Sequence, residues 1–282
     1  NIFETILSLI LLITIIEKRF ARWKMKRKVS LIICIVFAMT ASVIMTSCGK
    51  SSERALDPYK ILKAASDKWK NIKDIDMDMS LNMTDNSKRT NAKIDANIKQ
   101  VIISGNDADM IIDMNLNIPS QNINTEITFY YKDSICYADA LGYKVKYKTD
   151  MSKMKQMAGL SLDSMGLSPE ITDKATATPD GNNTKLYFKV KPEKAKEMLE
   201  KALSSSMISG SSLKSRDLKS GNLIIEALVD KDNNFKSCSM KFNLNGNIRL
   251  DTQILINKVN SGLTLNFPSF KGYEEQGELG LF

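Results

Sequence analysis

The sequence predicts an α+β fold, in which a strongly curved antiparallel β-sheet, a half-barrel, carries about three helices over its concave face. Three features of the 282-residue chain lead to this prediction. Apolar and polar residues alternate strictly in many short segments, polar turns separate those segments, and only three stretches have the spacing of an amphipathic helix. Three modest helices carry too few apolar side chains to cover so many strands, so the sheet is expected to curve its apolar face inward.

The first expected helix follows Asp57, because aspartate is a preferred N-cap and Pro58 suits the first helical position. The apolar residues that follow recur at helical spacing and define one face, formed by Leu62, Ala65, Trp69 and Ile72. This helix is therefore expected to pack on the sheet along that face.

Strict alternation begins at Asp74 and predicts the first strand. Its apolar face consists of Ile75, Met77, Met79, Leu81 and Met83. A period of two places successive side chains on opposite faces of a strand. The same pattern predicts further strands over residues 92–98, 110–118, 123–131, 135–138 and 143–147. Strands spaced this closely, with polar turns between them, are typical of an antiparallel meander.

The second half repeats the pattern around two more helical stretches. Methionine and leucine recur at helical spacing within residues 151–166, and Pro192 opens the third expected helix. Residues 172–183 are expected to form a polar loop, and residues 230–234 a hairpin turn; Asn245-Gly246 is a strong hairpin signal. Further strands are expected over residues 185–191, 223–229, 238–244, 250–259 and 263–267, which makes about ten in the chain.

A secretory signal precedes this domain. Met25 is followed by three basic residues, an apolar stretch over 29–44, and small or polar residues that lead to Cys48. The run Met45-Thr46-Ser47-Cys48 resembles the bacterial lipobox, although methionine stands where leucine is usual. The resemblance implies that the Cys48 thiol receives a diacylglycerol and becomes the new N-terminus, with an acyl chain such as palmitate. Two acyl chains anchor a protein stably. The alternative is an uncleaved transmembrane helix over 29–47.

These features divide the chain into four parts. Translation is expected to begin at Met25, which would make residues 1–24 an upstream artefact; a genuine extra apolar segment is the alternative. Residues 25–47 form the signal peptide, 48–56 a lipidated tether, and 57–282 a single domain. The expected location is the extracytoplasmic face of a bacterial cell membrane. The abundance of lysine, asparagine and isoleucine is typical of an AT-rich genome and favours a Gram-positive source.

The charge of the chain gives no support to nucleic-acid binding. The formal net charge is +8, but residues 1–47 hold seven basic and two acidic residues. The remaining 33 basic and 30 acidic residues leave a net charge of only +3, with both signs interspersed. A nucleic-acid-binding domain is expected to carry a basic patch or stripe. No nucleic-acid partner is therefore expected.

The residue types also disfavour an enzyme or a metal site. The chain contains no histidine, which removes the commonest general base and zinc ligand. The alternating carboxylates Asp74, Asp76 and Asp78 are expected to form a solvated strand face, since one strand cannot surround a Ca²⁺ ion. Cys136 and Cys238 are isolated in the sequence; either they pair or, as is commoner, each is a buried apolar residue. No catalytic residue, metal or cofactor is predicted.

The order of these elements resembles the LolA/LppX-like lipoproteins, a bacterial superfamily, and its uncharacterised Gram-positive branch above all. The resemblance rests on the lipobox, the opening helix, the meander, the mid-chain helical stretch and the later strands. It includes the aromatic pair Tyr130-Tyr131 and the hairpin around Gly142-Tyr143, and covers about residues 57–273. It implies a half-barrel sheet with a helical plug, which binds a lipid or another apolar molecule. It transfers no catalytic residue.

The expected ligand-binding residues lie on the inward faces of the strands. Methionine is flexible and adapts to irregular apolar ligands, and aromatic rings supply apolar area. The candidates are Met77, Met79, Met110, Met114, Phe129, Phe188, Met240 and Phe242. The alternative is that these side chains simply pack a core. In that case the domain would act as an interaction or regulatory module for another envelope protein, without a ligand.

Overall fold

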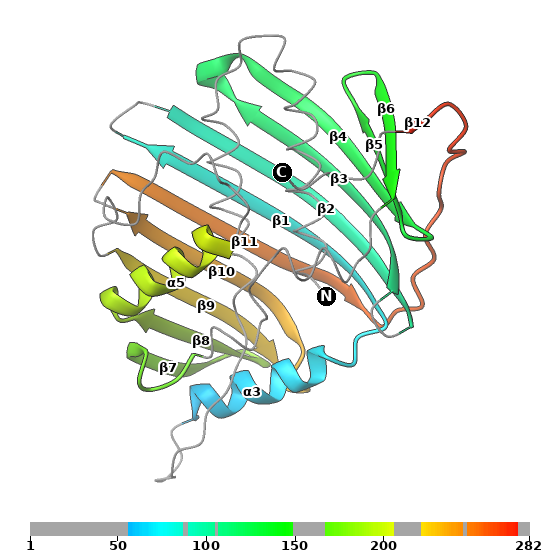
Figure 1. Cartoon of the computed structure of the whole chain (residues 1–282). Coiled ribbons are helices and arrows are strands. Elements are labelled where there is room, and N and C mark those ends of the chain that lie inside the picture. Colours follow the sequence, from blue (N-terminus) through cyan, green and yellow to red (C-terminus); the bar gives the residue numbers. More distant parts are fainter. Residues whose placement is uncertain are drawn as a thin grey trace.

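The computed structural model describes residues 56–86, 90–104, 107–148, 167–205, 221–244 and 247–275. These residues form one open sheet of twelve strands, two α-helices and one turn of 3-10 helix (Figure 1). The helices are α3 (Pro58–Trp69) and α5 (Pro192–Ser205), and the 3-10 turn is η1 (Pro119–Gln121). None of the helices in these ranges is long and apolar enough to cross a bilayer.

Two antiparallel meanders make up the sheet. The first contains β1 (Asp74–Asp85), β2 (Thr90–Ser104), β3 (Asp107–Ile118), β4 (Ile123–Lys132), β5 (Ile135–Ala140) and β6 (Tyr143–Lys148). The second contains β7 (Thr172–Asp180), β8 (Asn183–Val190), β9 (Asn222–Asp230), β10 (Phe235–Leu244) and β11 (Ile248–Val259). They join where β1 pairs with β11, and the order is β12-β6-β5-β4-β3-β2-β1-β11-β10-β9-β8-β7. The short β12 (Glu274–Glu275) pairs in parallel with β6.

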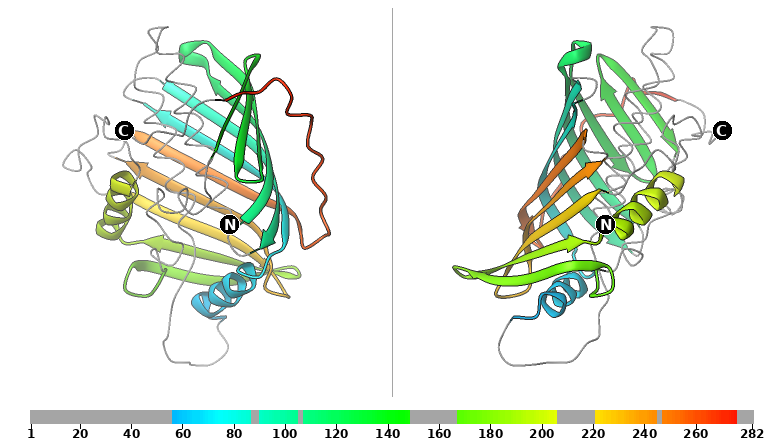
Figure 2. Two further views of the ribbon diagram at one scale, coloured as in Figure 1. Left: turned by 45° about the vertical axis from the view of Figure 1, so that its right-hand side comes forward. Right: turned by 90° about the vertical axis from the view of Figure 1, so that its left-hand side faces the viewer.

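The sheet is twisted and curved, and it bends around the side on which α3 and α5 lie (Figure 2). The alternation of the sequence explains which side that is. In β1 the apolar residues are buried and the residues between them are mostly exposed or half-buried. The apolar faces of the strands and helices form a single buried cluster. The predicted α+β class with a curved sheet is therefore confirmed, and the observed sheet is open and mostly antiparallel, with β12 as a parallel strand.

Helix α3 forms where the sequence predicts it and fixes one end of the sheet. The Asp57 carboxylate caps the helix by accepting hydrogen bonds from two backbone amides of its first turn. The ring of Tyr59 lies 5.6 Å from that of Phe188, and Trp69 packs edge-on against Phe235 at 5.7 Å. The Tyr59 hydroxyl also forms a hydrogen bond with that of Thr172 in β7. These contacts hold the apolar face of α3 on β7, β8 and β10.

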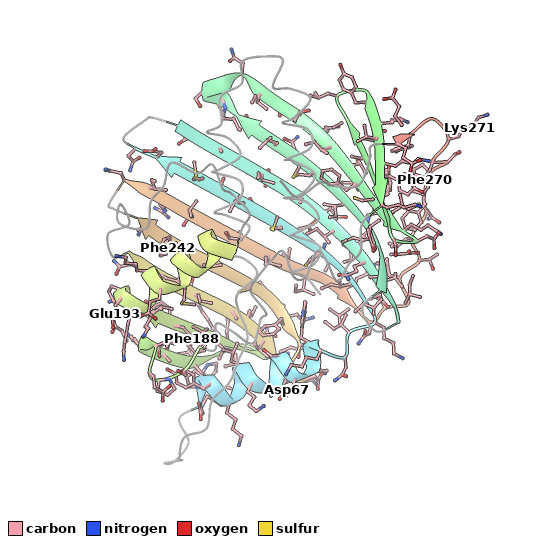
Figure 3. The ribbon with its side chains drawn as sticks, in the orientation of Figure 1. Asp67, Phe188, Glu193, Phe242, Phe270 and Lys271 are labelled. Carbon is pink, nitrogen blue, oxygen red and sulfur yellow. The ribbon has the colours of Figure 1, made fainter. Side chains whose placement is uncertain are left out.

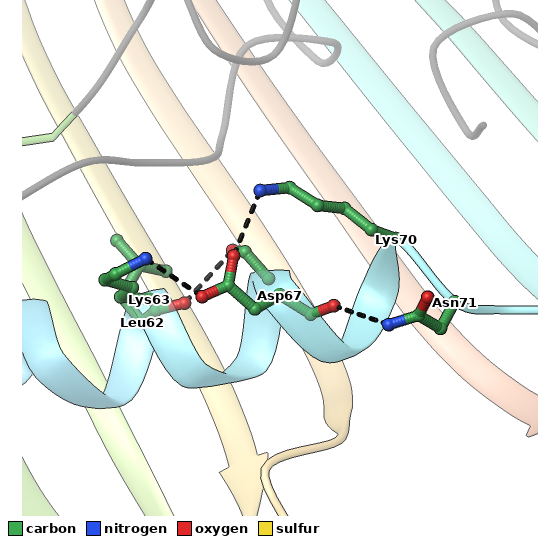
Figure 4. A network of polar contacts seen from close by, with 6 residues as sticks. Leu62, Lys63, Asp67, Lys70 and Asn71 are labelled. Atoms are coloured by element: carbon green, nitrogen blue, oxygen red, sulfur yellow. Dashed lines mark hydrogen bonds and ion pairs between the residues drawn. The ribbon is translucent and has the colours of Figure 1, made fainter.

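The outer face of α3 is held by exposed polar pairs. The Asp67 carboxylate accepts hydrogen bonds from Lys63 at 2.9 Å and Lys70 at 3.0 Å (Figure 4). Their proximity lowers the pKa of the Asp67 carboxyl. Exposed pairs of this kind contribute little to stability, because water screens them. Burial of Leu62, Ala65 and Trp69 is what binds the helix to the domain.

Three expectations about the elements need correction. The structure describes two α-helices rather than about three, and the helix expected over 151–166 lies outside the described residues. Residues 172–180 form an edge strand, not a polar loop. Pro179 is tolerated there because an edge strand pairs with a neighbour on one side only, so a missing backbone N–H need not break the ladder. Residues 263–267 form no strand. Instead, the chain beyond β11 crosses the polar face and leads into β12.

The C-terminal segment is attached by an aromatic cluster on the polar face. Phe270 stacks on Tyr137 of β5 with ring centroids 3.7 Å apart, and it also contacts Tyr130, Phe267 and Tyr273. Figure 3 places Phe270 and Lys271 at the β6 side of the sheet, far from α3. The pairing of β12 with β6 covers part of an edge that would otherwise present open backbone groups.

Candidate functional site

All eight candidate ligand-binding residues lie on the buried apolar face. Each is at most 5% exposed and belongs to the single apolar cluster. They fall into two groups along the sheet. The first lies on β1, β3 and β4 and comprises Met77, Met79, Met110, Met114 and Phe129. The second lies on β8 and β10 and comprises Phe188, Met240 and Phe242.

The first group forms rows that run across the strands. Met79 is paired with Ala96 of β2, Ala96 with Met114, and Met114 with Ile127 of β4. A small side chain therefore lies between two flexible ones. Thioether side chains can change rotamer at little cost, so this row is the part of the face that can best accommodate an added apolar group.

The second group lies at the end of the sheet that carries the helices. Phe188 contacts Tyr59 of α3, and Figure 3 shows Phe188 and Phe242 on the strands beside α3 and α5. Ala195 and Met198 of α5 are buried in the same cluster. Among the described elements, α3 and α5 contact the sheet chiefly at β7, β8 and β9. The second group therefore lies at the helix-bearing end of the sheet, where Phe188 contacts α3, whereas the first group lies on strands farther from the helices.

Polar groups on the apolar face were missed by the sequence analysis. Gln100 is paired with Ile75 on one side and Met110 on the other, and it is almost fully buried. Tyr131 is the partner of Met110 in β4 and is also buried. Continuing the alternation of β2 two positions beyond Ile98 would have placed Gln100 on this face. A few polar groups within an apolar surface are what fix the orientation of a ligand.

The two cysteines of the domain do not pair. Neither forms a disulfide, and both lie on the apolar face, Cys136 on β5 and Cys238 on β10. Six strand spacings separate these strands in the sheet, on the order of 28 Å along its surface, and a disulfide needs Cα atoms about 5.5–6 Å apart. Burial raises the pKa of the Cys238 thiol to about 12. Cys238 is thus a protonated packing residue.

The opposite face carries a groove of about 680 Å³. It crosses β11, β1, β2, β3 and β4, and its lining includes carboxylates, amides and hydroxyls together with the exposed Leu255. Four apolar residues that are buried on the apolar face also line it, namely Met79, Ala96, Met114 and Ile127. The Asn97 amide donates to Asp76 at 3.2 Å and Asp78 at 2.8 Å, and the Asn257 amide donates to the same two carboxylates. Within the described ranges, no group of His, Cys, Asp or Glu is placed to hold a metal ion.

Asp74 departs from the expected solvated row. Asp78 is exposed, whereas Asp74 is only 6% exposed. Its carboxylate accepts hydrogen bonds from the Ser261 amide at 2.8 Å, the Ser261 hydroxyl at 3.1 Å and the Gly262 amide at 3.1 Å. Burial alone would raise the pKa of Asp74, but these donors outweigh it and lower the pKa below its ordinary value. Asp74 is therefore a structural link to the chain beyond β11.

Comparison with known proteins yields structural likenesses only. No protein-family model matches the chain, and no curated protein does. Similar solved structures include LprF from Mycobacterium bovis, at 11% identity and a TM-score of 0.45, covering 77% of this chain and 100% of that one. Lipoprotein LppX from Mycobacterium tuberculosis is similar at 10% identity and a TM-score of 0.40, covering 73% of this chain and 97% of that one.

A third likeness is to an outer membrane lipoprotein-sorting protein domain from Vibrio parahaemolyticus. It has 9% identity and a TM-score of 0.27, and covers 74% of this chain and 95% of that one. Lipoproteins and a lipoprotein-sorting domain are thus among the solved structures to which the chain is similar. At such identities and TM-scores the likeness assigns no ligand and no residue role to this chain.

Proposed function

We propose that the chain is a membrane-anchored extracytoplasmic lipoprotein, which binds a lipid or another apolar ligand on the apolar face of its sheet and acts as a carrier or sensor. One observation carries this proposal. A continuous apolar face extends across the sheet, and the described helices pack chiefly on β7, β8 and β9. Transfer of a ligand's apolar surface out of water is favourable by roughly 25 cal/mol per Å². No catalytic chemistry is required.

The ligand-binding region is assigned to the first group of residues, on β1 to β4. The row from Met79 through Ala96 to Met114 supplies flexible apolar contacts around a small residue. Gln100 and Tyr131 supply polar atoms beside Met110. This arrangement suits an amphipathic molecule, whose apolar chain would lie along the methionines and whose polar group would approach Gln100 and Tyr131.

A pair of matched substitutions tests the assignment. Ala96→Leu adds bulk between Met79 and Met114, whereas Ala227→Leu adds the same bulk to another buried alanine of the face, on β9 where α5 packs. Each change costs about 1–3 kcal/mol of stability by overpacking. The protein purified from its own host is extracted with solvent, and bound lipid is measured by native mass spectrometry. Ala96→Leu is expected to lower bound lipid several-fold, and Ala227→Leu to leave it unchanged.

Equal lipid loss in both variants would contradict the assigned region, and absence of bound lipid from the unmodified protein would contradict ligand binding altogether. Thermal unfolding of both variants provides the control for folding. The two variants should lower the melting temperature to a similar extent. A loss of lipid in Ala96→Leu alone then cannot result from destabilisation.

The proposed anchor is tested separately at Cys48, which lies outside the described residues. Cys48→Ser removes the thiol that would carry the diacylglycerol. The variant is expected to lose labelling by radioactive palmitate and to change the mass of the N-terminal peptide. Unchanged palmitate labelling in the variant would refute anchoring at this residue.

A second candidate is an envelope interaction or regulatory module with a packed core and no ligand. The near-complete burial of all eight candidate residues favours it, because side chains so well covered are typical of a core. Crosslinking in cells distinguishes the two functions. Recovery of one stoichiometric partner, together with no extractable lipid, would support the module and contradict the carrier.

A further inference from the structure

The turn between β5 and β6 has an unusual residue at a strained backbone position. Leu141 has φ of 53° and Gly142 has φ of 80°, as a two-residue type I′ turn requires. The other described non-glycine residues with positive φ are all short and polar: Asn122, Asp133, Ser134, Asn233 and Asn260. Asparagine and aspartate tolerate this region because their side chains bond locally. Leucine gains no such compensation, so another reason for its presence is needed.

The side chains of this turn project into open space. Leu141 is 52% exposed and Tyr143 is 59% exposed, so two of the largest exposed apolar side chains among the described residues are on one hairpin. A Cβ atom placed on Gly142 would meet no atom within 4 Å. The strained turn thus presents apolar surface rather than burying it. We call Leu141, Gly142, Tyr143 and Lys144 the hairpin tip.

The charges around the hairpin tip nearly balance. The Lys144 ammonium lies 3.4 Å from the Asp139 carboxylate and 5.6 Å from the centre of the Tyr273 ring. Lys146 and Lys148 follow on the same face of β6. On β12, Glu275 is paired with Lys146 and Glu274 with Val145. Any partner of the hairpin tip is therefore recognised mainly through the apolar side chains, with Lys144 at their margin.

We propose that the hairpin tip inserts into the interfacial layer of a lipid bilayer. Two exposed side chains offer far less than the roughly 800 Å² per partner that a stable protein interface buries, but single side chains suffice for shallow insertion among lipids. Tyrosine is favoured at the membrane interface, where its ring is buried and its hydroxyl stays wet. Lysine beside it can extend its ammonium to the headgroups. The proposal does not depend on whether the sheet binds a ligand.

The full chain is already attached to vesicles, so binding alone would not test the proposal. The test therefore measures insertion at the hairpin tip itself. Tyr143→Trp places a fluorophore at the tip, and Ile103→Trp places one at an exposed site, 56% accessible, near the opposite ends of the strands. Each protein is reconstituted in vesicles of phosphatidylcholine and phosphatidylglycerol, part of the phosphatidylcholine being brominated on its acyl chains. Bromine quenches tryptophan that reaches the acyl region. The unmodified protein, which contains Trp23 and Trp69, gives the background quenching. Quenching above this background is expected for Tyr143→Trp and not for Ile103→Trp.

A second substitution separates insertion from folding. Leu141→Asn removes the apolar side chain but suits the positive φ better, so the melting temperature should stay equal or rise. In the Tyr143→Trp background it should reduce quenching at least twofold, and the reduction should persist in high salt because the tip carries little net charge. Absence of quenching at position 143, equal quenching at position 103, or unchanged quenching with Leu141→Asn would each overturn the proposal.

Discussion

Asp74 shows how one buried charge can connect two distant parts of a chain. It begins β1, yet its carboxylate is satisfied by Ser261 and Gly262, which follow β11. Hydrogen bonds to a charged group contribute more than those between neutral groups, about 1.5–3 kcal/mol. Asp74 therefore helps to fix the register of β1 against β11, and the alternation of the sequence could not show this, because the donors come from residues far along the chain.

Replacing this carboxylate is expected to destabilise the domain. Asp74→Asn puts an amide N–H against backbone N–H donors, and should lower the free energy of unfolding by about 2 kcal/mol at pH 7. Asp78→Asn is the matched control on the exposed side of the same strand and should change it by less than about 0.5 kcal/mol. Urea unfolding measures both. Similar losses in the two variants would contradict the structural role of Asp74.

The lowered pKa of Asp74 also predicts how the stability of the domain depends on pH. The folded protein lowers the pKa of Asp74 below its ordinary value of 3.8, so the unfolded state binds the proton more readily. The stabilisation is fully present above the unfolded pKa and is lost as the pH falls through the folded pKa. The difference in unfolding free energy between the unmodified protein and Asp74→Asn should therefore shrink below about pH 4. A difference that is the same at pH 7 and pH 3 would refute this assignment.

The two thiols of the domain should be inert. Cys136 is buried, and burial raises the pKa of Cys238 to about 12, so few thiolates form at neutral pH. Both residues should resist iodoacetamide at pH 8 in the folded protein and react in denaturant, as peptide mapping by mass spectrometry would record. Rapid labelling of either residue in the folded state, or a peptide that links them, would contradict the placement of these strands.

At the scale of elements, a strand is predictable where its own residues determine its burial. β1 and β3 alternate strictly, and the structure confirms both. β7 has few apolar residues and forms because β8 offers a partner edge, so its pattern resembles a loop. β12 has only two residues and depends on the aromatic contacts that precede it. The sequence did not predict β7 and β12, because each forms through contacts with other segments rather than through its own residue pattern.

The aromatic cluster of the C-terminal segment gives a prediction at this scale. Phe270→Ala removes the ring stacked on Tyr137, and should destabilise the domain by about 2 kcal/mol. Lys271→Ala, at the next and exposed position, is the control and should have little effect. Hydrogen exchange should increase at β6 and β12 in the first variant only. Unchanged protection of β6 would show that the segment does not hold this edge.

The same variant should alter a tyrosine titration. Burial, with a smaller effect of Asp139, raises the pKa of Tyr273 to about 12. Loss of the Phe270 ring would expose Tyr273, and its pKa should then fall toward 10. Because the folded pKa is raised, the stabilisation is present below pH 10 and is lost as the pH rises toward 12. Absorbance at the phenolate band measures the titration, and an unshifted curve in Phe270→Ala would contradict this cause.

At the scale of the whole molecule, the class of fold follows from the sequence but the assembly of its two halves does not. Alternation identifies which side chains are buried, and all eight candidate ligand-binding residues are indeed on the apolar face. It does not show that Phe188 and Phe242 lie near the helices while Met79 and Met114 lie beyond them. That difference arises from the pairing of β1 with β11, which places the second meander beside the first.

This central pairing has a consequence for how the molecule is made. Ile75 is paired with Val259, so a strand that emerges early from the ribosome waits for one that emerges near the end. Until β11 is available, β1 exposes unpaired backbone groups beside apolar side chains, and such an edge promotes aggregation. The first half of the domain must therefore be kept apart from other copies until β11 is available to pair with β1.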